Sequence, residues 1–434
     1  MSPGAALHAL TLAPARARVA DGSLLPSAYA AWLCAHARGS DADIHAWAHR
    51  DPAYIAECAA TADRVHRTAH GALQGMPIGI KDIIATAALP TQYGSAIYAG
   101  HREAEDAECV KRITGAGGYV FGKTVTTEFA FMQPGVTRNP WNVAHTPGGS
   151  SSGSAAAVAA RHVPAAVGSQ TNGSVIRPAA FCGVIGFKPT LGSIAMSGTL
   201  VFSPTLDTLG TFTRSVDDAA WLASVLAAPG RIAPKTLART RPPRIALLEC
   251  YPWTTIDTEA GAALAAVAAR LRIAGADVTD TTLPDALLDA PAVHRTLMLY
   301  EAARNLAHLP REKLSATLAR ALDEGKRIDA DAYARALATR TAMRATAIDW
   351  MAHFDAVMSP PARGTAPASL DTTGDPACCA LWSLLGFPAI TLPIGLAGNR
   401  MPLGMQLAST PDSDDSLLSV AAWAEARLPF RGLP

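Results

Sequence analysis

The chain has 434 residues with a formal net charge of +1 at pH 7; 49% of the residues are hydrophobic and 17% are charged. This composition is typical of a globular protein with a large apolar core, and the near-neutral charge argues against nucleic acid or an anionic membrane surface as a partner. The sequence contains no apolar run of about 18 residues that could span a membrane. Its start lacks the basic-then-apolar order of a signal peptide. The seven cysteines are scattered without a CxxC pair, so we expect reduced thiols in a cytoplasmic protein.

Residues 1–70 are rich in alanine and space their apolar side chains as helices do. A short β-prone run over 75–82 follows, bounded by turn formers. This pattern predicts that Lys81 lies at the end of a strand. Residues 117–122 predict a second strand of the same kind.

Two loops rich in glycine and serine come next. The first covers 139–153 and opens directly into a predicted helix over 154–161, and the second covers 168–174. Glycine lets a backbone approach a ligand closely, because it has no Cβ atom. Both loops are therefore candidate parts of a functional site.

The second half of the chain shows alternating strand and helix patterns. Residues 244–249 predict a buried strand, 258–274 a helix and 276–283 a further strand, which together form a βαβ unit with parallel strands. Residues 387–394 predict another strand and 412–427 an acid-capped helix. No internal repeat or low-complexity linker interrupts the chain, so we expect a single large α/β unit over 1–434.

Three interpretations of the Gly/Ser loops start from the residues alone. They could simply connect elements at the surface, which is the default for such segments. They could cradle a phosphate at the helix start near Ser154, although no Gly-Lys-Ser/Thr follows the glycines. Residues 149–153 also fit the G-x-S-x-G elbow formally, but a proline-rich loop, not a strand, leads into it.

A further interpretation pairs a loop serine with a lysine base. A lysine can accept a proton from a serine if burial lowers its pKa enough to leave the amine neutral. Lys81 follows an apolar strand, which makes it a candidate. The plainer alternative is a solvated lysine, or one paired with a carboxylate such as Asp82, because buried lysines are rare.

The chain resembles the amidase signature family over about 75–215 and again over about 355–408. Five motifs carry the resemblance: Gly79-Ile80-Lys81-Asp82, Gly148-Gly149-Ser150-Ser151, Asn172-Gly173-Ser174 with Arg177-Pro178, residues 182–190, and residues 386–390 with 402–406. Ser150 and Ser174 are also 24 residues apart, as the bridging and nucleophilic serines of the family are. The resemblance implies an α/β/α sandwich with a mixed, mostly parallel central sheet covered by helices.

The resemblance also implies a Ser–cisSer–Lys triad. Ser174 would attack the amide carbonyl, Ser150, after a cis peptide bond with Gly149, would relay the proton, and neutral Lys81 would receive it. Ser151 would support the triad through a hydrogen bond. The backbone N–H groups that would form the oxyanion hole are those of Thr171, Asn172, Gly173 and Ser174. No metal or organic cofactor is implied.

The sequence departs from the family pattern beside the nucleophile. Many members have an aspartate four residues before it and an arginine two after it, where this chain has Gln170 and Ile176, and Asn172 replaces the usual glycine. An arginine occurs instead at Arg177, as in malonamidase-like members. Arg177 either has a structural role or binds a substrate carboxylate in a bidentate manner. We expect Gln170 and Gly149 to contact the substrate as well.

These features predict an amidohydrolase that cleaves the C–N bond of a small linear amide or ureide and releases ammonia or an amine. The expected partner is a small-molecule amide, with no nucleic acid or membrane involved, and a homodimer is compatible with the sequence. An alternative within the family is the amidotransferase component that releases ammonia for a partner enzyme working on charged tRNA. An alternative of another class is a binding protein that has kept the fold and lost the activity.

Overall fold

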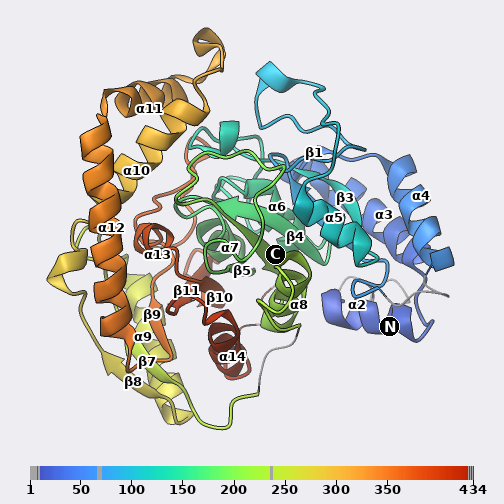
Figure 1. Cartoon of the computed structure of the whole chain (residues 1–434). Coiled ribbons are helices and arrows are strands. Elements are labelled where there is room, and N and C mark those ends of the chain that lie inside the picture. Colours follow the sequence, from blue (N-terminus) through green and yellow to red (C-terminus); the bar gives the residue numbers. More distant parts are fainter. Residues whose placement is uncertain are drawn as a thin grey trace.

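The computed structural model describes Leu7 and residues 10–65, 71–234, 238–428, 430, 432 and 434. An 11-stranded sheet organises it, with the strand order β1-β3-β2-β4-β6-β5-β10-β11-β9-β7-β8. Strands from early and late parts of the chain thus lie in one sheet (Figure 1). The strands are β1 (Trp47–His49), β2 (Pro77–Lys81), β3 (Tyr119–Thr124), β4 (Ala165–Gln170), β5 (Ile185–Lys188), β6 (Thr208–Thr213), β7 (Arg244–Leu247), β8 (Asp277–Asp280), β9 (Ala356–Ser359), β10 (Ala389–Leu396) and β11 (Pro402–Ala408).

Helices pack around this sheet (Figure 1). They are α2 (Leu12–Ala20), α3 (Pro26–Ile44), α4 (Pro52–Val65), α5 (Glu108–Gly115), α6 (Ser152–Ala159), α7 (Ile176–Cys182), α8 (Val216–Leu226), α9 (Thr258–Ile273), α10 (Ala290–Asn305), α11 (Ala316–Arg327), α12 (Ala330–Met351), α13 (Ala380–Leu385) and α14 (Asp414–Glu425). Helices α11 and α12 both pack on α10, and the three form an arm at one side of the molecule, drawn in yellow-orange to orange in Figure 1. Within the described ranges, no helix is both long and apolar enough to cross a bilayer.

Most of the predicted elements are confirmed. The strand ending at Lys81, the helix after the first Gly/Ser loop and the parallel βαβ unit β7–α9–β8 all lie where the sequence places them. The helical character of the N-terminal part is confirmed by α2, α3 and α4 for the described residues before 66.

The expectation of a mostly parallel sheet is wrong. Six of the ten strand pairings in the described part of the chain are antiparallel. β10 and β11 are joined by a short turn and therefore pair as a hairpin, and β6 inserts antiparallel between β4 and β5. Two parallel blocks remain, β3-β2-β4 and β9-β7-β8, one at each side of the sheet.

The block β3-β2-β4 forms the base of the candidate site. Every residue of these three strands is buried, as expected for parallel strands covered on both faces. Helix α6 lies so close to this block that a Cβ atom on Gly153 would be 2.3 Å from both the Ala46 oxygen and the Val125 nitrogen. Only glycine fits there, so the first Gly/Ser loop is packed tightly against the sheet.

Candidate active site

Lys81 is the last residue of β2, and its side chain is fully buried. Its Nζ donates hydrogen bonds to the hydroxyls of Ser150 (2.7 Å) and Ser169 (2.9 Å). Ser169 lies near the end of β4, which runs parallel to β2 beside it, so both strands bring their carboxyl ends to the same sheet edge. Burial lowers the pKa of Lys81 to about 7, although the carboxylate of Asp207 favours the charged form.

The two plainer interpretations of Lys81 do not hold. It is not solvated, and the neighbouring Asp82 carboxylate faces a different lysine, with the Lys123 Nζ 3.5 Å from its Oδ1. The Lys123 amine also donates to the carbonyl of Ile84 (2.7 Å) and the hydroxyl of Thr91 (2.5 Å). Lys123 is thus a structural, paired lysine, whereas Lys81 has only hydroxyl partners.

Ser150 lies in the first Gly/Ser loop, and the Gly149–Ser150 peptide bond is cis, as the resemblance implied. The loop is held from two sides: Thr127 N donates to the carbonyl of Ser150 (3.2 Å), and Arg177 Nη2 donates to that of Gly149 (2.8 Å). A Cβ atom on Gly149 would lie 2.8 Å from the Cγ2 of Thr373. The close packing leaves no room for any side chain at that position.

Ser151 was expected to bond within the triad, but its hydroxyl is directed elsewhere. It donates to the carbonyl of Ser169 (3.1 Å) and accepts from the N–H of the same residue (3.3 Å). Ser151 therefore fixes the backbone of Ser169, whose hydroxyl in turn contacts Lys81. The sequence did not single out Ser169, because its closeness to Lys81 depends on the pairing of β2 with β4.

Ser174 lies in the turn between β4 and α7. In the part of the chain that the structure describes, its hydroxyl has no hydrogen-bond partner and lines a cavity of about 40 Å³. Arg177 and the residues Thr171, Asn172 and Gly173 line the same cavity. The structure thus places Ser174 and the expected oxyanion loop around one small chamber.

Gln170 does not line that chamber, contrary to the expectation that it contacts substrate. Its side chain is fully buried, and its amide oxygen accepts from the N–H groups of Val175 (2.8 Å) and Ile176 (3.0 Å). Its amide nitrogen donates to the hydroxyl of Ser383 (2.9 Å). The N–H groups at the start of a helix have no partner within the helix. At the start of α7 the side chain of Gln170 accepts from those of Val175 and Ile176 and so acts as the cap. Gln170 thereby holds the turn that carries Ser174.

The backbone of the loop 171–174 has an unusual hydrogen-bond pattern. The carbonyl of Thr171 accepts from His294 Nε2 (3.0 Å), that of Asn172 from the Ser383 hydroxyl, and that of Gly173 from Arg177 N (2.9 Å). Among the described residues, no acceptor receives the N–H groups of residues 171–174. Thr171 and Asn172 are half-buried and Gly173 and Ser174 are buried. Buried N–H groups normally have partners, so four adjacent N–H groups without a protein acceptor beside a cavity are a candidate anion-binding nest.

Arg177, in the first turn of α7, is almost completely buried, and this burial lowers its pKa. Its Nη2 donates to the carbonyl of Gly149 and to the Thr373 hydroxyl (3.1 Å). Its Nε and Nη1 are buried without a hydrogen-bond partner among the described residues. A buried cation with unused donors at the wall of the Ser174 chamber is a ready site for a negative group.

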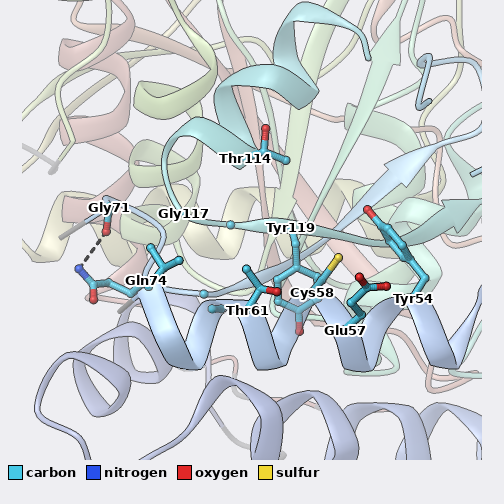
Figure 2. Close-up of a pocket in the computed structure, with 13 residues that line it drawn as sticks. Tyr54, Glu57, Cys58, Thr61, Gly71, Gln74, Thr114, Gly117 and Tyr119 are labelled. Atoms are coloured by element: carbon cyan, nitrogen blue, oxygen red, sulfur yellow. Dashed lines mark hydrogen bonds between the residues drawn. The ribbon is translucent and has the colours of Figure 1, made fainter. Parts of the chain in front are cut away.

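A larger cavity of about 370 Å³ lies elsewhere, between α4 and the segments that precede β2 and β3. Figure 2 shows Gln74 hydrogen-bonded to Gly71 at one end of this cavity and Tyr54 at the other. Gln74 precedes β2 and Tyr119 begins β3, whereas Lys81 ends β2. The cavity therefore lies at the amino-terminal ends of these strands, opposite to the end that carries Lys81, and its lining contains none of the candidate catalytic residues.

A mixed α/β fold in which a buried lysine contacts a serine after a cis peptide bond, with a further serine exposed to a cavity in the turn before a helix, is typical of amidohydrolases of the Ser–cisSer–Lys type. Comparison with known proteins agrees: the Amidase family model matches residues 30–418. The chain belongs to the amidase signature family.

Among curated proteins, the chain is similar to the A subunit of the glutamyl-tRNA(Gln) amidotransferase of Synechococcus sp. (strain CC9605), with 33% identity over 404 residues, covering 81% of this chain and 82% of the relative. The corresponding protein of Chloroflexus aggregans (strain MD-66 / DSM 9485) is 30% identical over 467 residues, covering 95% of each chain.

Among solved structures, an amidase superimposes with a TM-score of 0.88 and 28% identity, covering 96% of this chain and 100% of that chain. The native peptide amidase of Stenotrophomonas maltophilia has a TM-score of 0.82 and 28% identity, and 98% of each chain is covered. A 6-aminohexanoate cyclic dimer hydrolase has a TM-score of 0.86 and 27% identity, also with 98% of each chain covered.

Proposed function

We propose that this amidase cleaves the C–N bond of a small linear amide through an acyl-enzyme on Ser174, with Lys81 as the base acting through Ser150. The observation that carries the proposal is the buried Lys81 amine, 2.7 Å from the Ser150 hydroxyl and with a pKa of about 7. A neutral amine in such a place can accept a proton at physiological pH.

The proposed reaction has two halves. Ser174 Oγ bonds to the amide carbon while its proton passes to Ser150, whose own proton passes to Lys81 Nζ. The tetrahedral intermediate then expels the amine, which takes a proton back through the same relay, and leaves an ester on Ser174. Water attacks this ester by the same route and releases the carboxylic acid.

The oxyanion of each intermediate would bind to the free backbone N–H groups of Thr171, Asn172, Gly173 and Ser174. The support is that none of these donors has a protein acceptor within the described ranges. Preorganised donors of this kind are among the largest contributions to catalysis, about 3 kcal/mol for each.

We further propose a short, carboxylate-bearing amide or ureide as the substrate, as in malonamidase-like members. Nη2 of Arg177 is already engaged by Gly149 and Thr373, so the substrate carboxylate would bind chiefly to the unpartnered Nη1 rather than to a free two-pronged edge. The small cavity of about 40 Å³ beside Ser174 favours a short acyl group, and the unused donors of Arg177 favour an acidic one.

Replacing Arg177 with leucine should raise the KM for acidic amides by about 10–100-fold, the value of a charge-assisted hydrogen bond, and change that for neutral amides much less. The measurement is the ratio of kcat/KM for an acidic amide to that for its neutral counterpart. Thr373→Val is the matched control, since it removes a partner of Nη2 but leaves the cationic charge. An unchanged ratio in Arg177→Leu would rule out carboxylate binding there.

A panel of small amides tests the activity itself. Malonamate, ureido acids, and aliphatic and aryl amides are incubated with the wild-type enzyme and with Ser174→Ala, and released ammonia is measured. We expect at least one acidic amide to be turned over by the wild type alone. Ammonia release at the same rate from both proteins, for every amide, would refute the proposal.

A second candidate function is that of an amidotransferase A subunit, because the curated relatives that match 81–95% of this chain carry that name. It predicts that a stoichiometric partner protein co-purifies with the chain from its native cells. A chain that purifies alone and turns over malonamate by itself would exclude it.

A further inference from the structure

Side chains from three distant parts of the chain hold the loop 171–173, and none of them lines the cavity. The hydroxyl of Thr171 donates to Asp207 Oδ1 (2.6 Å), and its carbonyl accepts from His294 Nε2 (3.0 Å). The carbonyl of Asn172 accepts from the Ser383 hydroxyl. These contacts join the turn after β4 to the end of the loop before β6, to α10 and to α13.

Because the peptide unit is planar, these carbonyl contacts also determine the directions of the neighbouring N–H groups. The C=O of one residue and the N–H of the next lie in one planar trans unit and point in opposite directions. A carbonyl of Thr171 fixed towards His294 therefore directs the N–H of Asn172 away from His294. In the same way, Ser383 sets the direction of the Gly173 N–H through the carbonyl of Asn172.

We infer that His294, Asp207 and Ser383 are positioning residues, which aim the backbone N–H groups of the oxyanion hole by anchoring the carbonyls and the Thr171 side chain behind it. The inference rests on the function proposed above. None of the three side chains lines the cavity, so each acts through the loop.

Each anchor is itself firmly held. Asp207 is buried, and its other oxygen accepts from the N–H groups of Phe202 (2.7 Å) and Ser203 (2.9 Å). The Ser383 hydroxyl receives a hydrogen bond from Gln170, which also caps α7. A fixed network of this kind costs no reorganisation when charge develops on the substrate oxygen.

His294 is buried on α10, and burial lowers its pKa to about 4, so the ring is neutral at pH 7. A neutral ring that faces a carbonyl through Nε2 must carry its proton on that nitrogen. Met298, one helical turn further along α10, lines the Ser174 cavity. The arm of α10–α12 in Figure 1 therefore reaches the active site at two points, a carbonyl anchor and a cavity wall.

The test compares His294→Leu with His294→Gln. Leucine removes the donor to Thr171, whereas the glutamine amide can restore an N–H at a similar reach. The readout is the second-order rate of Ser174 labelling by a fluorophosphonate, because that reaction also places negative charge on an oxygen in the hole and needs no known substrate. We expect a fall of about 10–100-fold for leucine, less than the loss of a whole donor, and recovery to near the wild-type rate for glutamine.

A second pair guards against a folding defect in the α10 variants. Thr171→Val loses the hydroxyl that binds Asp207, and Thr171→Ser keeps it. We expect slower labelling for valine than for serine. The melting temperature of Thr171→Ser should stay near that of the wild type, and that of Thr171→Val should fall modestly, because the buried Asp207 keeps only its two backbone donors. Where an amide substrate is in hand, kcat should fall in parallel with labelling while KM changes little.

Two results would overturn the inference: wild-type labelling in both His294→Leu and Thr171→Val, or equal losses within each pair, which would point to packing alone. If the proposed mechanism is wrong and Ser174 is not an activated nucleophile, the wild type is not labelled at all. If only the proposed substrate is wrong, the wild type is labelled but the amide panel shows no turnover. Both results differ from a failure of the positioning inference, in which the wild type is labelled and the variants are labelled equally fast.

Discussion

Replacing Ser174 with alanine should lower kcat/KM by on the order of 10⁶-fold, the loss found when the nucleophile of a nucleophile–base unit is removed. The Ser174 hydroxyl has no hydrogen-bond partner within the described residues, so its removal leaves no buried group unsatisfied. We therefore expect the melting temperature to stay at the wild-type value while turnover and fluorophosphonate labelling are lost. Ammonia release and intact-protein mass spectrometry measure the two losses.

Ser152→Ala is the matched control for this variant. Ser152 is a buried serine of the first Gly/Ser loop, and its hydroxyl donates to the Val125 carbonyl (3.3 Å) rather than facing the cavity. We expect its kcat/KM to stay within a few-fold of the wild type, since one weak hydrogen bond is lost, worth about 1 kcal/mol. Substantial turnover by Ser174→Ala, or labelling that persists in it, would show that another serine is the nucleophile.

The location of the candidate site follows from short segments whose local chemistry is clear. Lys81 ends an apolar run bounded by turn formers, and such a run forms a buried strand wherever it lies in the fold. The glycines at 149 and 153 mark a loop that must pack closely against its neighbours, and both meet atoms that exclude a side chain. The resemblance to the amidase signature family then relates Ser150 to Lys81, and the structure joins them by a hydrogen bond.

The partners that hold the site could not be predicted in this way. Ser169 reaches Lys81 only because β2 pairs with β4, and His294 reaches Thr171 only because α10 packs over the turn after β4. These contacts join residues 88 and 123 positions apart, respectively, and no local pattern encodes them. The orientation of Gln170 was missed for a related reason: the start of α7 decides where its amide points.

The pairing of strands in the sheet is also hard to predict from local sequence, because it too depends on contacts between distant parts of the chain. Only 244–283 has the strand–helix–strand pattern that predicts parallel pairing, and β7 and β8 are indeed parallel. The short strands β5 and β6 carry no comparable pattern, and their antiparallel insertion beside β4 depends on long-range pairing. Local sequence therefore predicts where strands and helices occur better than it predicts which strands pair in the sheet.

Replacing Lys81 with alanine should lower kcat/KM by about 10⁴-fold or more, because it removes the base that contacts Ser150. Lys81→Met is the better variant for stability, since it fills a similar volume with an apolar side chain. Burial depresses the folded-state pKa of Lys81 to about 7, well below the value of about 10.4 in an unfolded chain. Between these values the unfolded chain binds a proton that the folded chain lacks, so the free energy of unfolding rises with pH.

Removing Lys81 should therefore flatten this pH dependence, and at pH 6 the melting temperature of Lys81→Met should equal or exceed that of the wild type. An inactive variant that is no less stable would show that the loss is chemical and not a failure to fold. A Lys81→Met protein that melts well below the wild type at pH 6 would instead mean that the lysine is a structural ion.

The pH profile of the wild-type enzyme provides the sharpest test of the neutral amine. Only the unprotonated form of Lys81 can act as a base, so kcat/KM should be constant well above pH 7 and fall about tenfold per unit below it. The Asp207 carboxylate favours the charged lysine, so Asp207→Asn should lower the pKa of Lys81 and move this acid limb to lower pH. The single amide oxygen of asparagine can accept either from Thr171 or from the N–H groups of Phe202 and Ser203, but not from both sides, so the level of kcat/KM should fall as well while the position of the limb reports the charge. A limb that stays in place in Asp207→Asn, or that moves to higher pH, would mean that a group other than Lys81 controls the rate.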